Sequence, residues 1–425
     1  MSTASIAAAA QRPTASISSR RTFAAGSLAV LVVYSLPLLL GFLRTGYLPH
    51  LLSTDESIYA VRVLDIYRGG TVASPYLPGH NDAPRFMPEL GERALALAAR
   101  LTRIPPLTVL ALSRVVVALL IFFVLWRIAG ALDFPPLLAL LATLIPVLGL
   151  SPNALSVHFL RYMRLVSPAI YVLVLLIALY GWLLLWKKPK AGAAAVLAAV
   201  TTGALFYTPV YYWSFAALGA LVLGIITADA SRWVLSTFVI AVVIGAPALL
   251  HSGAIASLPE VQQTLHRLDL LTPGRAPDIS VLPRFIAGAV FCVIVWTQRH
   301  RAGPDATFLL AFLVPGTLLL VQNAVTNRHA QSYHVVECLI PTGALALCAM
   351  IRHWRFARPA LLRAAVIVIV VAALGSHAGA YFRWETDVRR AGLLTRFDAQ
   401  FPATLTWINA HVPPSAVLLA ADYDR

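Results

Sequence analysis

Residues 23–43 read FAAGSLAVLVVYSLPLLLGFL and form the first long apolar run of the chain. The run contains no charged residue and is long enough for a helix that crosses the ~30 Å hydrocarbon core of a bilayer. It is longer than the hydrophobic region of a secretory signal, and no Ala-x-Ala-like cleavage site follows it. We therefore expect an uncleaved first membrane span that follows a cytoplasmic tail over residues 1–22.

The composition of the whole chain agrees with a membrane location. Of the 425 residues, 59% are hydrophobic and 12% are charged, and the mean hydropathy is +0.78. A soluble globular protein is much less apolar than this. The net charge of +15 comes without a compact basic run or a nucleic-acid-binding motif, so no nucleic acid is expected as a partner. The three cysteines lack metal-ligand spacing and do not form a disulfide framework.

Further apolar runs follow the first one at short intervals. Together they predict an all-α polytopic protein of about 11 transmembrane helices. Residues 23–375 would form this transmembrane domain. The expected spans after the first are 107–128, 137–150, 169–186, 191–206, 213–226, 233–250, 285–297, 307–321, 335–351 and 361–375.

The basic residues of the short loops predict the orientation of the spans. Arginines precede the first run, and every second short turn after it is basic. All the lysines of the chain, Lys187, Lys188 and Lys190, lie in one of these turns. Because short cytoplasmic loops are rich in Lys and Arg, we expect a cytoplasmic N-terminus and an extracytoplasmic C-terminus. The long loops and most of the acidic residues then lie outside.

The first outer loop, residues 44–106, opens with STDESIYAVR at positions 53–62. A helix that begins at Ser53 has a capping box, in which the Glu56 side chain returns to the Ser53 amide. Asp55, Tyr59 and Arg62 then lie on one face of this helix, at i, i+4 and i+7. Because Glu56 is engaged in the cap, Asp55 is the freer carboxylate.

Arginines in the first two outer loops are candidate phosphate ligands. Arg85 follows in a turn-rich segment, and Arg93 lies on an expected amphipathic helix over residues 89–101. Arg161 and Arg164 lie one turn apart just before a span. The guanidinium fork matches phosphate oxygens. The alternative is that these side chains only reach the interface and are solvated there.

A later outer loop, residues 322–334, combines amides with Arg328, His329 and His334 between two spans. Placing so many polar side chains next to lipid hydrocarbon costs free energy unless they form hydrogen bonds or have a function. We expect these three residues to contact substrate. The histidines would suit a divalent metal together with Asp55 or Glu56, but the linear spacing matches no metal motif. We therefore assign no metal ligands.

These features resemble the GT-C superfamily of integral-membrane glycosyltransferases. The resemblance is carried by the Asp55-Glu56 pair directly after the first span, the interfacial helical loop, about 11 spans and the extracytoplasmic C-terminus. Protein O-mannosyltransferases and the aminoarabinose transferases that modify lipid A belong to this superfamily, as do many uncharacterised bacterial proteins. The resemblance places the chain in a bacterial inner membrane.

The resemblance also implies a reaction. A polyprenyl-phosphate-linked sugar would be the donor, and a lipid, glycan or protein outside the membrane would be the acceptor. Asp55 matches the first-loop Asp of the family and would be the general base, with Glu56 as its helper. The outer arginines would stabilise charge on the leaving phosphate. The transfer would invert the anomeric carbon.

The segment 376–425 turns polar and departs from the larger members of the superfamily. It contains an expected amphipathic helix over residues 387–401, followed by a short helix and one strand of buried type. A lone strand does not form a stable sheet. We therefore expect the start of an extracytoplasmic soluble domain that is cut short.

Two other function classes stay open at this stage. A transporter or flippase for a lipid-linked or anionic substrate would carry ionisable residues at mid-span depth, and the sequence has few of them. A glycan polymerase or ligase would also use outer Arg and His residues. It would depend more on a long late loop, whereas here the early loop is the richest.

Overall fold

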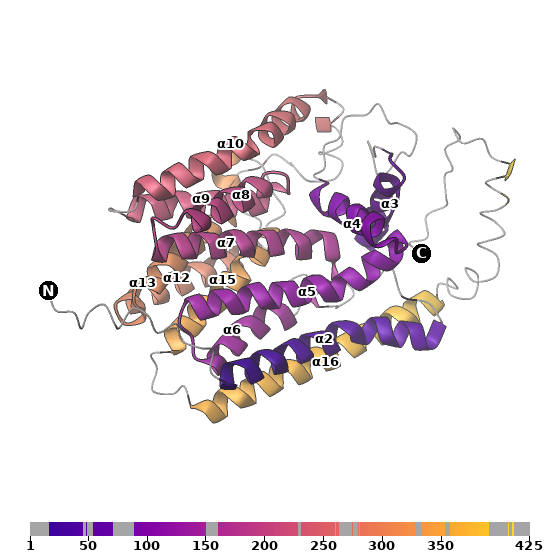
Figure 1. Ribbon diagram of the computed structural model, residues 1–425, viewed down its shortest axis with the longest axis horizontal. Helices are drawn as coiled ribbons and strands as arrows, with labels where there is room; N and C mark the ends of the chain where they lie inside the picture. Colours follow the sequence, from indigo (N-terminus) through magenta and orange to yellow (C-terminus); the bar gives the residue numbers. More distant parts are fainter. Residues whose placement is uncertain are drawn as a thin grey trace.

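The computed structural model describes residues 17–45, 54–70, 89–149, 160–227, 231–259, 281–327, 333–352 and 358–390, with a few isolated positions besides. This part of the chain is helical and contains no strand. Most helices lie roughly parallel to one another, so that they form one elongated bundle (Figure 1). The expected all-α architecture is confirmed for these residues.

Six helices are long and apolar enough to cross a membrane. They show that the chain is a multi-pass membrane protein, as the composition predicts. Five of the candidate spans lie in α2 (Ile17–Thr45), α5 (Pro106–Ala131), α10 (Ser231–Ala256), α15 (Tyr333–Ile351) and α16 (Pro359–Arg390), and the sixth, Leu165–Lys187, consists of the short segment η2 (Leu165–Ile170) and α7 (Tyr171–Lys187).

Shorter helices complete the bundle. Four of them are apolar helices of 10–17 residues, which pack between the longer ones. They coincide with predicted spans, but they are shorter than a bilayer core requires, so the full count of crossings stays a prediction. These helices are α6 (Pro136–Leu148), α8 (Gly192–Leu205), α9 (Val210–Ile226) and α13 (Pro304–Leu319), and α12 (Leu282–Ala302) lies beside them.

The contact between α7 and α8 shows how the bundle packs. A Cβ placed on Gly181 of α7 would lie 2.7 Å from the Ala198 backbone nitrogen of α8. The absence of that atom lets the two backbones approach closely, as small residues do between membrane helices. Beside this contact, the buried Trp182 indole donates a hydrogen bond of 3.0 Å to Thr202 Oγ1. The indole N–H is therefore satisfied inside the bundle.

Helices α2 and α16 pack together along one edge of the bundle (Figure 1). The Arg44 guanidinium, near the end of α2, pairs with Glu385 of α16. It also lies 5.3 Å from the centre of the Phe382 ring. Helix α16 continues to Arg390, although the sequence predicted that this span ends at residue 375. The contact with Arg44 engages polar residues of this extension, beyond the apolar run.

Helices α3 (Thr54–Tyr67) and α4 (Leu90–Thr102) lie together at the right-hand end of the bundle in Figure 1. We call this the α3/α4 end. Helix α3 begins one residue after its predicted start, and α4 lies within one residue of its predicted bounds. The apolar face of α4 is buried, and the Arg100 guanidinium donates a hydrogen bond of 2.6 Å to the Ile66 carbonyl of α3. The two helices expected in the first outer loop are therefore present in its described residues.

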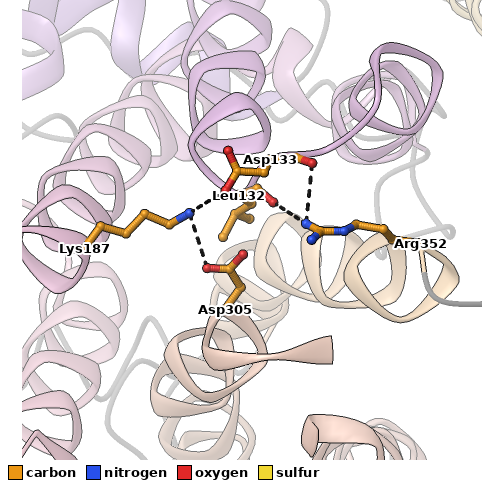
Figure 2. Close-up of polar contacts among 5 residues, drawn as sticks. All are labelled: Leu132, Asp133, Lys187, Asp305 and Arg352. Carbon is orange, nitrogen blue, oxygen red and sulfur yellow. Dashed lines mark hydrogen bonds and ion pairs between the residues drawn. The ribbon is translucent and has the colours of Figure 1, made fainter. Parts of the chain in front are cut away.

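The opposite end of the bundle carries a group of charged side chains in its turns (Figure 2). Lys187 Nζ lies 3.1 Å from Asp133 Oδ2 and 3.5 Å from Asp305 Oδ1. The Arg352 guanidinium donates a hydrogen bond of 2.9 Å to the Leu132 carbonyl. We call these residues the turn network. It joins the ends of α5, α7 and α15 to the start of α13.

Candidate functional site: a buried polar belt

A buried ion pair connects the two helices of the α3/α4 end. Arg62 Nε of α3 lies 3.1 Å from Glu92 Oε1 of α4, and the two side chains are 4% and 0% exposed. Burial raises the pKa of Glu92, because a charged carboxylate loses its hydration there, and the Arg62 charge opposes this shift. Charges are rarely buried unless they are paired or used.

Tyr171 connects this pair to the helices of the bundle. The residue begins α7 directly after a π-helical segment, η2 (Leu165–Ile170). A Cβ placed on Gly91 of α4 would lie 2.9 Å from Val166 Cγ1 and 3.7 Å from the Tyr171 ring. Tyr171 interacts electrostatically with both Glu92 and Tyr59. Helix α4 therefore packs directly on the start of α7.

Beyond Tyr171, side chains of α9 and α15 form a hydrogen-bonded group. The rings of Tyr171 and Tyr212 are 5.5 Å apart. The Tyr212 hydroxyl donates to Glu337 Oε2 over 3.0 Å, and His334 Nδ1 lies 3.0 Å from the same oxygen. Ser167 Oγ of η2 lies 3.5 Å from the Tyr212 hydroxyl. One carboxylate oxygen therefore connects two helices.

Two arginines lie beside this group. Arg161 begins a 3₁₀ turn, η1 (Arg161–Met163), and Arg164 separates this turn from η2. Both guanidinium groups interact electrostatically with Glu337, and Arg161 is only 3% exposed. The expected pair of arginines before this span is thus located within electrostatic range of a buried carboxylate.

These contacts and electrostatic interactions relate a set of buried or half-buried polar side chains, which we call the polar belt. It extends across the α3/α4 end from the first outer loop to the start of α15. Its members are Arg62, Glu92, Tyr171, Tyr212, Glu337, His334, Arg161 and Arg164.

An apolar groove lies beside the polar belt, between α12, α13 and α15. It has a volume of about 430 Å³, and its wall includes Val336 and Leu339 of α15 and the single charged residue Arg284. Next to it, Tyr211 belongs to a small apolar cluster with Val335 and stacks on the His334 ring at 4.9 Å. The first turn of α15 therefore separates the groove from the polar belt.

The structure brings together five of the residues that the sequence singled out: Tyr59, Arg62, Arg161, Arg164 and His334. Arg93 also acts electrostatically on Glu92, but it lies at the surface. Its side chain is 56% exposed and pairs with Glu89 on its own helix at 2.7 Å.

The remaining predicted site residues lie outside the described side chains. Asp55 and Glu56 are the second and third residues of α3, so their backbone is placed one turn before Tyr59. Their side chains, and the whole of Arg85, Arg328 and His329, lie outside the described residues. The assignment of the base therefore stays a prediction. Within the described chain, no group of three His, Cys, Asp or Glu side chains could hold a metal ion.

Sequence reasoning missed several members of the polar belt, namely Glu92, Tyr171, Tyr212 and Glu337. A signal was present for Glu337, because it is the only acidic residue in its span and follows His334 by one helical turn. For Tyr171 no signal was present, since an aromatic residue near a span end is typical of an interface, and Tyr212 lies in an aromatic turn for which an interface was the default interpretation.

No protein-family model matches this chain, and no curated protein matches it. The candidate site therefore depends on its own geometry and chemistry.

Proposed function

We propose that this protein is a membrane glycosyltransferase that transfers a sugar from a polyprenyl-phosphate donor to an acceptor outside the membrane. The donor needs an apolar path for its chain and cationic groups for its phosphate. In this proposal the chain crosses the membrane about 11 times, with the α3/α4 end facing outward. The N-terminus is then cytoplasmic and the membrane is a bacterial inner membrane.

The observation that carries the proposal is the position of the apolar groove beside the polar belt. A chain in the groove would run along α15 toward Val336, in the same turn as His334 and Glu337. Arg284 in the groove wall supplies positive charge, and Arg161 and Arg164 act electrostatically on Glu337, which follows Val336 of that wall in the sequence. Guanidinium groups suit phosphate oxygens.

Asp55 is the proposed general base and Glu56 its helper. In the reaction, an acceptor hydroxyl or amine attacks the anomeric carbon, and the bond from that carbon to the phosphate oxygen breaks. The acceptor proton passes to Asp55, and the electron pair of the broken bond goes to the phosphate. A base located near the reacting atoms contributes about 10²–10⁴-fold to such a rate.

A transfer assay tests this function. The purified protein in nanodiscs is given polyprenyl-phosphate sugars labelled in the sugar, with a bacterial envelope fraction as acceptor. We expect labelled sugar to leave at least one donor, and Asp55→Asn to reduce the rate by about 10²-fold or more. Lys187→Ala, a change at the opposite end, is the matched control and should keep the wild-type rate.

Two results would contradict the proposal. If the wild type consumes none of the donors and does not bind polyprenyl phosphate, the donor class is wrong. If Asp55→Asn retains full activity, Asp55 is not the base, and the assignment from the resemblance is withdrawn.

A transporter or flippase is the second candidate, and a specific observation favours it. Arg114 of α5 and His377 of α16 are both fully buried within candidate spans. Buried ionisable residues inside membrane spans are typical of transport pathways. The assay separates the two functions, because a flippase would move the labelled lipid across the bilayer without cleaving the bond between sugar and phosphate.

A further inference from the structure

A second apolar groove lies between α5 and α7, which pack side by side in the bundle (Figure 1). It has a volume of about 590 Å³, so it is larger than the groove beside the polar belt. We call it the α5/α7 groove. Its wall residues recur every three or four positions, so they form one face of each helix. They are Leu120, Phe123, Val124 and Arg127 of α5 and Leu173, Ile177 and Tyr180 of α7.

The groove is open to the outside of the bundle. Leu120 and Phe123 are 43% and 46% exposed, and both helices belong to candidate membrane spans. Leu173 and Ile177 are half-buried, whereas most of α7 is buried. Lipid can therefore reach α7, a largely buried helix, along this groove.

Both faces of the groove have a polar side chain toward the turn network. Helices α5 and α7 run in the same direction, since Asp133 follows α5 and Lys187 ends α7. The Arg127 guanidinium donates a hydrogen bond of 3.3 Å to the Tyr180 hydroxyl. A guanidinium has five N–H donors, and a tyrosine hydroxyl that accepts one bond can still donate its own proton. The groove thus combines apolar walls with a cationic, donor-rich end.

The position of Arg127 separates this groove from the proposed reaction site. Helix α5 begins at the α3/α4 end, because it directly follows α4. A helix rises about 1.5 Å per residue, so Arg127 lies about 30 Å along α5 from Pro106. A phosphate at Arg127 would be too far from Asp55 for sugar transfer. The groove therefore suits a lipid that is not the substrate.

We propose that the α5/α7 groove binds an anionic phospholipid of the membrane, with one acyl chain against its walls and the headgroup phosphate at Arg127 and Tyr180. Guanidinium groups suit phosphate oxygens, and basic pockets between membrane helices bind anionic headgroups. The turn after α7 adds the positive charge of Lys187, Lys188 and Lys190. A zwitterionic headgroup is less suitable, because Arg127 repels its ammonium. This inference does not depend on the proposed reaction.

Native mass spectrometry of the full chain, titrated in detergent micelles with dioleoyl phosphatidylglycerol, tests the inference. It resolves the first bound lipid and gives an apparent dissociation constant. We expect Arg127→Gln to weaken this binding about tenfold, because a charge-assisted hydrogen bond is lost. The wild type should bind dioleoyl phosphatidylcholine about tenfold more weakly than phosphatidylglycerol, and Arg127→Gln should bind the two lipids alike.

Matched variants make the test specific to the groove. Arg232→Gln changes an exposed arginine of α10 that lies 5.8 Å from the Trp233 ring, and it should bind like the wild type. Ile177→Trp fills the apolar wall and should weaken the binding of both lipids. Val243→Trp, at a 66% exposed position of α10, should not.

Tyr180→Phe provides a second test of the headgroup position, in case Arg127→Gln does not fold as judged by gel filtration. It keeps the ring and removes the hydroxyl, so phosphatidylglycerol should bind about threefold more weakly. Soluble glycerol phosphate should not compete, because it has no chain to occupy the groove.

Several results would overturn the inference. These are equal affinity of the wild type and Arg127→Gln for phosphatidylglycerol, equal affinity of the wild type for both lipids, or the same loss in Arg232→Gln as in Arg127→Gln. A wild-type dimer that Ile177→Trp dissociates would instead assign the groove to a second copy of the chain. The expected lipid preference in a protein that transfers no sugar would support this site and reject only the proposed function.

Discussion

The two ends of the helical bundle hold their charges in different ways. At the end with the turn network, Asp133 and Lys187 have side chains that are 75% and 30% exposed. At the α3/α4 end, Arg62 and Glu92 have side chains that are 4% and 0% exposed. Exposed pairs are screened by water and contribute little to stability, whereas a buried charge is costly unless it is compensated. The two ends therefore differ in how deeply their charged side chains are buried, and this burial, rather than the number of charges, distinguishes a candidate site from a turn.

The largest effect is expected from breaking the buried pair at the α3/α4 end. Arg62→Leu leaves Glu92 buried without its cation, so the free energy of unfolding should fall by about 3–5 kcal/mol. The double variant with Glu92→Leu removes both charges and should recover most of the loss. Unfolding equilibria in bicelles, measured by steric trapping, give both values. Equal losses for the single and double variants would show that the pair is not coupled.

A smaller loss of unfolding free energy is expected from substitutions where α15 packs on α9. Glu337→Leu removes the oxygen that Tyr212 and His334 share, and it should cost about 1–3 kcal/mol of unfolding free energy. Glu337→Gln keeps an acceptor oxygen and should cost less. The same unfolding experiment compares the two variants. If Leu is tolerated as well as Gln, the shared oxygen does not hold these helices together.

The stability of the α3/α4 end should also depend on pH. Burial raises the pKa of Glu92 above its value in the unfolded chain, so the folded protein binds more protons between these two pKa values. The stabilising effect of protonated Glu92 is complete below the unfolded pKa and is lost as the pH rises through the folded pKa. The slope is at most about 1.4 kcal/mol per pH unit.

Glu92→Gln is the matched variant for this prediction. It cannot titrate, so the difference in unfolding free energy between wild type and variant should change in this pH window and stay constant above it. A difference that does not vary with pH would contradict the raised pKa.

The smallest effect is expected in the turn network. Lys187→Ala removes two contacts, but Asp133 is largely exposed, so the loss should stay below about 1 kcal/mol. High salt should reduce this loss further. A loss as large as that of Arg62→Leu would mean that the two ends do not differ in the way proposed here.

The sequence predicted the helices well because long apolar runs have few alternatives in a membrane. The runs over residues 107–128 and 335–351 match α5 and α15 closely. It predicted the end of α16 poorly. The residues beyond position 375 are polar, and the ion pair between Arg44 and Glu385 that engages them joins positions 341 residues apart.

The candidate site was only partly predictable, because some of its residues interact across long distances in the sequence. The face of α3 indicated Tyr59 and Arg62, and the spacing before α7 indicated Arg161 and Arg164. The partners could not be read from local patterns, because Tyr212 and Glu337 are 125 residues apart and meet only through the packing of α9 on α15. Arg62 was expected to contact substrate, and the structure locates it against Glu92.

The central claim is that the α3/α4 end, and not the turn network, receives the donor phosphate. Photo-crosslinking tests it most directly, with a farnesyl phosphate analogue that carries a diazirine near the phosphate. The account predicts saturable labelling of peptides that contain Arg161, Arg284 or His334, and competition by unlabelled farnesyl phosphate. Saturable labelling confined to peptides that contain Asp133 or Lys187 would contradict it.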